Sequence, residues 1–289
     1  KKKGHQLTRP IGVGRIAQLK SLSTRTFRAN MLIWKWCYDH RFLLTPIRKK
    51  AMWSKLTSKV SKKNIDNIMV RAREIINAPH SKEALNWANK DFFKADNLDL
   101  LRLIHLDIWP EIKGFVNFKD PIIDHASLLI KAPSGEATRM HQDSAYWVDR
   151  EFAPTIFSVW IALEVMTKEK GGLNLLYQNE VPPAQMYKFN KGSTYEHEHE
   201  QINDAEASGG FPILITSAIE SELTKSMQLV NLERGEAVAF DSYEPHMTLE
   251  NTSGAPRLAM KIAYADRSQN TQKHPYLMKT IELEKQTKL

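Results

Sequence analysis

Two distant segments of this sequence hold side chains that together are suited to bind a transition metal. The first segment contains His141 and Asp143, and the second contains His246. Because alternate residues of a strand project to the same face, we expect His141 and Asp143 to present an imidazole and a carboxylate side by side. With His246 they would form a two-histidine, one-carboxylate set, which leaves positions open on Fe(II) for a co-substrate and oxygen.

A further pair of residues follows the second histidine. Thr248 lies two residues beyond His246, and Arg257 opens the next apolar stretch. A guanidinium presents a planar fork of donors that matches a carboxylate, and a hydroxyl can add another hydrogen bond. We therefore expect Arg257 and Thr248 to hold the far end of a dicarboxylic co-substrate.

The His-x-Asp tripeptide alone has simpler explanations. His141 could be a core histidine with a satisfied hydrogen bond, and Asp143 could cap a turn or a helix. The joint pattern is more specific. It requires His-x-Asp after a strand, then a distant Pro-His pair, and then an arginine that begins another strand.

The elements that must position these residues change in type along the chain. Helical spacing of apolar residues predicts helices first, over 21–60 with a break at Pro46, 65–77, 81–93 and 97–113. Strands are predicted later, over 122–132, 155–166, 236–241 and 257–265. This order predicts one catalytic domain over 1–289, mainly β with α. A double-stranded β-helix (jelly roll, cupin-like) would span 121–289, with the mostly helical residues 1–120 packed on it.

Two of these stretches give finer expectations. Over 155–166, one face carries Phe157, Val159, Ile161, Leu163 and Val165, and the other carries Ser158, Trp160, Ala162 and Glu164. Residues 191–212 are predicted to form a long surface loop, in which the histidine and glutamate run 196–200 is solvated.

Composition excludes several classes of protein. The chain has 289 residues, 42% of them hydrophobic and 26% charged, which is typical of a globular protein. Cys37 is the single cysteine, so an intramolecular disulfide and a four-cysteine zinc site are excluded. No apolar run is long enough for a membrane helix. Residues 1–10 are basic and lack the apolar core of a signal peptide, and because the sequence begins with Lys1 rather than Met, a leader or a tag could have been removed. We expect an intracellular protein, with the cytoplasm as one candidate compartment and the compartment otherwise unassigned.

The net charge of +8 is concentrated in residues 1–73. Charge runs of this kind usually form a solvated helical face. The excess also favours an anionic small-molecule substrate. Nucleic acid is the partner in an alternative hypothesis, in which a catalytically inactive jelly roll binds RNA or DNA through its basic N-terminal region. No pattern indicates an oligomeric state.

The segments LLIKAPSG, MHQDSAYW, SVWIALEVM, GGLNLL and GEAVAFDSYEPHMTLENTSGAPRLAMKIAY resemble the phytanoyl-CoA dioxygenase (PhyH)-like family of Fe(II)/2-oxoglutarate-dependent oxygenases. The resemblance covers about Ile122 to Tyr264. It implies Fe(II), 2-oxoglutarate and O2 as cofactors, and a catalytic metal site made by His141, Asp143 and His246. It also implies that 2-oxoglutarate is bound by Arg257, Thr248, Lys131, Gln142 and Trp160.

Substrate contacts are predicted only from proximity to the metal motif, for Arg139, Tyr146, Trp147 and Asn174. Alternatively, Arg139 forms a surface ion pair and the two aromatic residues pack in the core. The family usually has Gly-Ser-His after its Gly-x-Leu segment. Here Asn174 follows Gly172-Leu173, which disfavours a fatty acyl-CoA substrate.

The metal motif also narrows the set of reactions that the protein could catalyse. Asp143 disfavours halogenation, because related halogenases have a small residue there. Hydroxylation, desaturation and oxidative cyclisation of a small, carboxylate-bearing molecule of specialised metabolism remain. One narrower alternative is an oxidative cyclase of an N-prenylated amino acid, like the kainoid synthases. A cupin-like metal hydrolase or isomerase would need no Arg257 anchor.

Overall fold

The structure, a computed structural model, describes residues 52–77, 95–147, 156–182, 195–199, 213–269 and 278–279. All of them belong to one compact unit, Lys49–Leu289. The helices predicted before residue 52 and over 81–93 lie outside these ranges, as does most of the loop predicted over 191–212. None of the described helices is long and apolar enough to cross a membrane.

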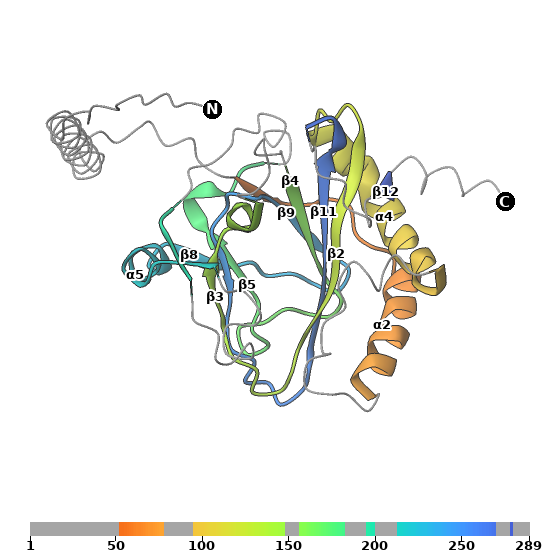
Figure 1. Cartoon of the computed structure of the whole chain (residues 1–289). Coiled ribbons are helices and arrows are strands. Elements are labelled where there is room, and N and C mark those ends of the chain that lie inside the picture. The colour runs from red at the N-terminus through yellow and green to blue at the C-terminus, as the bar shows by residue number, and fades with distance from the viewer. Residues whose placement is uncertain are drawn as a thin grey trace, which may run out of the picture. The chain divides into compact units, whose positions relative to one another are not determined.

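Two antiparallel sheets form the core of this unit (Figure 1). The major sheet has the order β1 (Trp53–Lys55), β9 (Ala237–Asp241), β4 (Ile156–Ala162), β11 (Arg257–Asp266), β2 (Pro121–Lys131) and β12 (Met278–Lys279). The minor sheet has the order β3 (Thr138–His141), β10 (His246–Thr248), β5 (Leu173–Leu176) and β8 (Met227–Leu229). A separate pair joins β6 (His197–His199) to β7 (Ile213–Ile215). This is the predicted mainly β, jelly-roll architecture.

Helices cover the outer face of the major sheet. Helices α2 (Lys62–Asn77) and α4 (Ala95–Phe115) lie along β2 and β11 in Figure 1. Their apolar residues, such as Ile68 and Ile108, are fully buried in one cluster with outward residues of the sheet. At its centre, the Tyr264 hydroxyl lies 3.0 Å from His105 Nδ1, and the Trp109 ring stacks on Tyr264.

Strand β11 separates this outer core from the space between the sheets. Leu258, Met260 and Ile262 belong to the outer cluster, whereas Ala259 belongs to a second cluster formed between the two sheets. Because side chains alternate along a strand, Arg257 and Lys261 share the inner face with Ala259. The strand thus places two cations inside the sandwich.

Strand β4 follows the predicted alternation. Phe157 and Ile161 lie in the outer cluster, and Trp160 lies in the inner one. The strand ends at Ala162, however, and Val165 is 45% exposed. The prediction for Val165 was wrong because the apolar pattern continues in the sequence beyond the last residue that pairs with β9 and β11.

Two other predictions need correction. The end of the stretch predicted as a helix over 21–60 is the strand β1, in which Trp53 pairs with Phe240 of β9. Tertiary packing overrides helical spacing here, because the Trp53 indole donates a hydrogen bond to the Leu176 carbonyl of the minor sheet at 2.8 Å. The stretch predicted as a loop over 191–212 contains β6, which pairs with β7.

Candidate metal centre and co-substrate site

The predicted ligands meet where two strands of the minor sheet pair. His141 of β3 stands directly opposite His246 of β10, and their ring centroids are 4.2 Å apart. Asp143 begins the 3-10 helix η1 (Asp143–Trp147), which turns its carboxylate back toward the two rings. One ligand atom from each residue lies within 4.8 Å of the others, and all three side chains are buried.

Backbone carbonyls fix both imidazoles in one tautomer. The Nδ1 atom of His141 lies 3.0 Å from the Arg139 carbonyl, and that of His246 lies 2.9 Å from the Glu244 carbonyl. Because a carbonyl only accepts, each Nδ1 must carry the proton, and each Nε2 is then the ring atom that can bind a metal. Burial lowers the pKa of His141 to about 3, so its imidazole is neutral at neutral pH, as a metal ligand must be.

The carboxylate of Asp143 is held by one of its oxygens. Oδ2 accepts hydrogen bonds from the Ser158 hydroxyl, at 2.8 Å, and from the Lys261 ammonium. Oδ1 lies 3.6 Å from Nε2 of His246 and remains directed at the ligand cluster. Burial raises the pKa of Asp143, but the Lys261 charge and the two imidazoles outweigh it and hold that pKa well below the usual range. The geometry and the charges fit a divalent metal ion.

Arg257 lies at the start of β11 with donors that lack acceptors. Its side chain is 3% exposed, and its Nε and Nη1 atoms are buried without a hydrogen-bond partner among the residues that the structure describes. The guanidinium carbon lies 5.7 Å from the centre of the Trp160 ring. A buried cation with unsatisfied donors is costly unless an anion completes it. These residues therefore fit the distal carboxylate of 2-oxoglutarate.

Lys131 and Thr248 adjoin this guanidinium. Lys131 stands opposite Arg257 in the pairing of β2 with β11, and its ammonium donates to Thr248 Oγ1 at 2.9 Å and to the Leu249 carbonyl at 2.7 Å. Since Thr248 Oγ1 accepts this bond, its own proton is free to donate to a carboxylate. Gly171 lies against the same Leu249 carbonyl. Its φ is +69°, and a Cβ there would lie 2.3 Å from the Leu249 oxygen, so the close approach requires glycine.

The amide of Gln142 has other contacts. Its Nε2 donates to the Tyr243 carbonyl, and its Oε1 accepts from the Tyr195 backbone at 2.9 Å. These bonds join η1 and β10 to the segment that leads into β6. A direct contact of Gln142 with 2-oxoglutarate stays a prediction.

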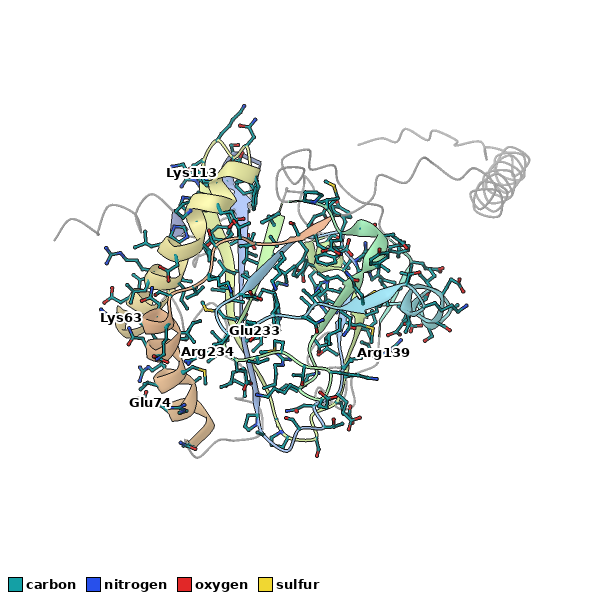
Figure 2. The ribbon with its side chains drawn as sticks, turned by 180° about the vertical axis from the view of Figure 1, so that it is seen from behind. Lys63, Glu74, Lys113, Arg139, Glu233 and Arg234 are labelled. Atoms are coloured by element: carbon teal, nitrogen blue, oxygen red, sulfur yellow. The ribbon has the colours of Figure 1, made fainter. Side chains whose placement is uncertain are left out.

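Arg139 lies away from the helices α2 and α4, where Figure 2 labels Lys63, Glu74 and Lys113. Its guanidinium donates to Glu220 Oε2 of helix α5 (Ser217–Thr224) at 2.8 Å and to Glu198 Oε1 of β6 at 3.2 Å. The Met140 amide donates to the other Glu220 oxygen at 3.0 Å. These bonds attach α5 to the strand that carries His141, which agrees with the ion-pair alternative for Arg139.

The other predicted substrate residues are placed differently. The Tyr146 hydroxyl donates to the Ile213 carbonyl at 3.0 Å, and its ring lies edge-on to His141. Trp147 ends η1. Asn174 stands opposite Met247, whereas Leu175 stands opposite His246. Asn174 therefore projects to the face of the minor sheet away from the ligands, and its amide donates to the Gly172 carbonyl.

Lys261 was not among the predicted site residues. Its side chain is 12% exposed, and its ammonium forms an ion pair with Asp143. The signal that could have found it is the alternation of β11, since Lys261 lies four residues after Arg257 and hence on the same face. Its contact with Asp143 joins residues far apart in the sequence, and no local pattern predicts it.

A cavity of about 620 Å³ lies elsewhere among the described residues, beside β1 and η2 (Tyr177–Asn179). It is lined by Ser54, Lys55, Tyr177, Gln178, Glu180, Val181 and Pro182. None of the predicted site residues lines it. It also lacks a histidine and a buried cation, so we do not place the metal or the co-substrate there.

Comparisons with known proteins agree with this geometry. The sequence model of the phytanoyl-CoA dioxygenase (PhyH) family matches residues 37–259. No significant match was found among curated proteins. Among solved structures, EctD from S. alaskensis in its apoform has a TM-score of 0.51 and 13% identity, over 76% of this chain and 74% of that chain.

Two further solved structures share the fold. EvdO2 from Micromonospora carbonacea var. aurantiaca, complexed with 2-oxoglutarate, has a TM-score of 0.50 and 18% identity, over 78% of this chain and 91% of that chain. The epimerase SnoN from nogalamycin biosynthesis, in complex with Fe3+, alpha ketoglutarate and nogalamycin RO, has a TM-score of 0.50 and 14% identity, over 75% of this chain and 80% of that chain. At these identities the likeness shows the fold.

Proposed function

Because the chain belongs to the phytanoyl-CoA dioxygenase family, we propose that it is an Fe(II)- and 2-oxoglutarate-dependent dioxygenase. It oxidises a C–H bond of a small molecule in specialised metabolism. The observation that carries this proposal is the juxtaposition of two sites inside one sandwich. The buried cluster of His141, Asp143 and His246 fits a divalent metal, and the unsatisfied donors of Arg257 fit a carboxylate.

His141, Asp143 and His246 would hold the iron through two Nε2 atoms and one carboxylate oxygen. When bound, Fe(II) supplies the chemistry that couples oxidative decarboxylation of 2-oxoglutarate by O2 to oxidation of the substrate. The carbonyls of Arg139 and Glu244 keep both rings oriented for ligation, and Ser158 keeps the carboxylate from rotating.

The co-substrate residues have separate tasks. Arg257 would pair with the distal carboxylate of 2-oxoglutarate in a dry environment, where a charge-assisted bond is strong. Thr248 would add its hydroxyl proton, and Lys131 orients that hydroxyl by donating to its oxygen. Trp160 would wall the pocket beside the guanidinium. The structures of EvdO2 with 2-oxoglutarate and of SnoN with Fe3+ and alpha ketoglutarate, which share the fold, support iron and 2-oxoglutarate as the cofactors.

The choice between hydroxylation, desaturation and oxidative cyclisation lies with the substrate. Each begins with cleavage of a C–H bond, and each uses the same ligands and the same co-substrate site. The presence of Asp143 in the cluster supports these outcomes over halogenation. The kainoid synthase-like cyclisation belongs to this set as one of its narrower cases.

The proposal is tested by succinate release from 2-oxoglutarate in air with Fe(II), comparing the wild type with His141→Ala. We expect slow, iron-dependent succinate release without substrate, and its loss by at least about 100-fold in the variant, because one of the three ligands is removed. Circular dichroism checks that the variant is folded. A wild-type protein that binds neither Mn(II) nor 2-oxoglutarate would refute the oxygenase assignment and favour the binding-protein alternative.

A further inference from the structure

The inner face of β11 carries a second cation besides Arg257. Lys261 lies four residues further along the strand, so the two Cα atoms are about 13 Å apart at the usual strand rise. Two alanines, Ala259 and Ala263, flank Lys261 on the same face. Arg257 and Lys261 therefore stand at two separate places inside the sandwich.

The Lys261 ammonium has donors left over. An ammonium carries three N–H groups, and within the described residues its one hydrogen-bond partner is Asp143 Oδ2. Its nitrogen also lies 5.9 Å from the centre of the Phe240 ring. Lys131 differs, because its ammonium donates to three oxygens, of Glu136, Thr248 and Leu249. The spare donors of Lys261 are thus available to a bound molecule.

The charge around Lys261 changes when the site is loaded. Asp143 and the keto-acid end of 2-oxoglutarate carry one negative charge each, and a divalent metal neutralises both. The Lys261 ammonium then loses its counter-charge, and Asp143 is its only ion-pair partner among the described residues. The other two cations each have a different carboxylate nearby. Burial lowers the pKa of both, while the negative charge of Glu164 acts to raise that of Arg257 and the negative charge of Glu250 acts to raise that of Lys131.

Polar side chains of β2 lie across from Lys261 on the inner face. Across the pairing of β2 with β11, Ser127 stands opposite Lys261, and His125 stands opposite Ala263. These residues share the inner face, where His125 is only half-buried. The Ser127 hydroxyl lies 2.6 Å from His125 Nε2. The partial exposure of His125 shows that solvent reaches this end of the inner face.

We infer that Lys261 anchors a carboxylate of the substrate, which rests on the proposed function and names its substrate class. The ammonium keeps its bond to Asp143 Oδ2 and gives its remaining donors to the anion, beside Ser127. The substrate is thereby fixed by its carboxylate near the metal, at the end of the inner face of β11 that is away from Arg257. Co-substrate and substrate are both acids, each held by its own cation of one strand.

The test uses the full chain loaded with Mn(II) and saturating 2-oxoglutarate, without oxygen, and two isosteric probes, butyrate and butyramide. Paramagnetic Mn(II) broadens the proton resonances of a molecule that binds close to it. We expect butyrate to bind about tenfold more tightly than butyramide in the wild type, because hydrogen bonds to a charged group are strong. Lys261→Met should remove this preference, and Lys261→Arg should restore most of it.

Two further variants keep the test decisive. Lys62→Met removes the same charge from an exposed side chain of α2 and should change nothing. Ser127→Asp leaves the bond between Lys261 and Asp143 in place but supplies an internal carboxylate, so it should abolish the preference for butyrate. If Lys261→Met fails to bind Mn(II), the result for Ser127→Asp decides whether Lys261 anchors the carboxylate.

Several outcomes would overturn the inference. Equal binding of butyrate and butyramide to a wild type that binds Mn(II) and 2-oxoglutarate would refute the anchor and leave the proposed function standing. A preference for butyrate that survives both Lys261→Met and Ser127→Asp would do the same. Loss of 2-oxoglutarate affinity in Lys261→Met would assign the ammonium to the co-substrate. A wild type that takes up no metal or 2-oxoglutarate would refute the proposed function itself.

Discussion

The two ends of the inner face of β11 differ in how their cations are satisfied. At one end, Arg257 is buried with donors that have no acceptor, and Lys131 and Thr248 are already joined beside it. At the other end, Lys261 is bonded to the ligand Asp143 and lies in a more open environment. The first end has donors suited to one fixed anion, whereas the second keeps its bond within the protein and offers its remaining donors to an incoming molecule.

This difference predicts different effects on ligand binding and on the stability of the empty protein. A guanidinium with orphaned donors destabilises the empty protein and gains fully from its ligand. An ammonium that is already paired costs the empty protein less, and it gains less per new bond. The co-substrate end should therefore show the larger effect on binding when it is altered, and the Lys261 end should show the larger effect on the stability of the empty protein.

The largest effect is expected when the Lys261 end loses its internal partner. Asp143→Ala leaves the ammonium nearly buried without a counter-charge, which should lower the free energy of unfolding of the metal-free protein by about 3–5 kcal/mol. The double variant Asp143→Ala with Lys261→Met should recover most of this loss. Urea denaturation measures both. If the double variant is no more stable than the single one, the ion pair is not what the carboxylate contributes.

At the Arg257 end, the expected effect appears in binding instead. Arg257→Met should weaken 2-oxoglutarate binding to the Mn(II)-loaded protein by about 100-fold or more, since it removes charge-assisted hydrogen bonds worth roughly 1.5–3 kcal/mol each. The free energy of unfolding of the empty protein should stay level or rise by about 1 kcal/mol. Calorimetric titration and urea denaturation test both, with Arg267→Met, at an exposed ion pair, as the matched control. A large loss of stability would contradict the comparison.

The same two ends show how far the sequence alone could lead. Arg257 was predicted because it follows Pro245-His246 at a short spacing and begins an apolar strand, so both signals are local. Lys261 was missed because its role depends on its contact with Asp143. That contact forms only when η1, which begins at Asp143, packs near β11 in the folded protein. Strands were predicted where β2, β4, β9 and β11 lie, and a clear alternation of apolar residues supported the prediction for β4.

Short elements escaped prediction for a related reason. Strand β1 has only three residues, and its partners are β9 and the Leu176 carbonyl, which no pattern near Trp53 reveals. Likewise, Asn174 was selected for its proximity to the metal motif in the sequence. The register of β5 with β10 determines its face, and that register places it opposite Met247 rather than His246.

A smaller effect is expected from pH at the Arg257 end. Burial, with a further contribution from the Arg257 charge, lowers the pKa of Lys131 to about 7 from 10.5. Above pH 7 the empty protein loses this proton, and binding of a dianion favours its return. The affinity for 2-oxoglutarate should therefore fall about tenfold between about pH 7 and 8.5.

The sign for stability is opposite to that for binding. Because the folded pKa of Lys131 is depressed, its charged form destabilises the fold below about pH 7, and this penalty fades as pH rises toward 10.5. Titrations of 2-oxoglutarate at several pH values, in buffers with different ionisation enthalpies, measure the proton uptake. Lys131→Met should flatten the pH dependence, whereas Lys62→Met should leave it unchanged. An unchanged slope in Lys131→Met would assign the proton to another group.

The smallest effect concerns which cation near the metal motif, Lys261 or Arg139, binds the substrate carboxylate. Arg139 is held by Glu220 and Glu198, so Arg139→Gln should cost about 1 kcal/mol of unfolding free energy, a hydrogen-bonded pair discounted for its solvent exposure. Glu220→Gln should cost a similar amount, because it breaks the same link between α5 and β3. Neither change should alter the preference for butyrate over butyramide in the Mn(II) experiment. If Arg139→Gln abolishes that preference while Lys261→Met keeps it, Arg139 is the anchor, as its position next to the metal motif first suggested.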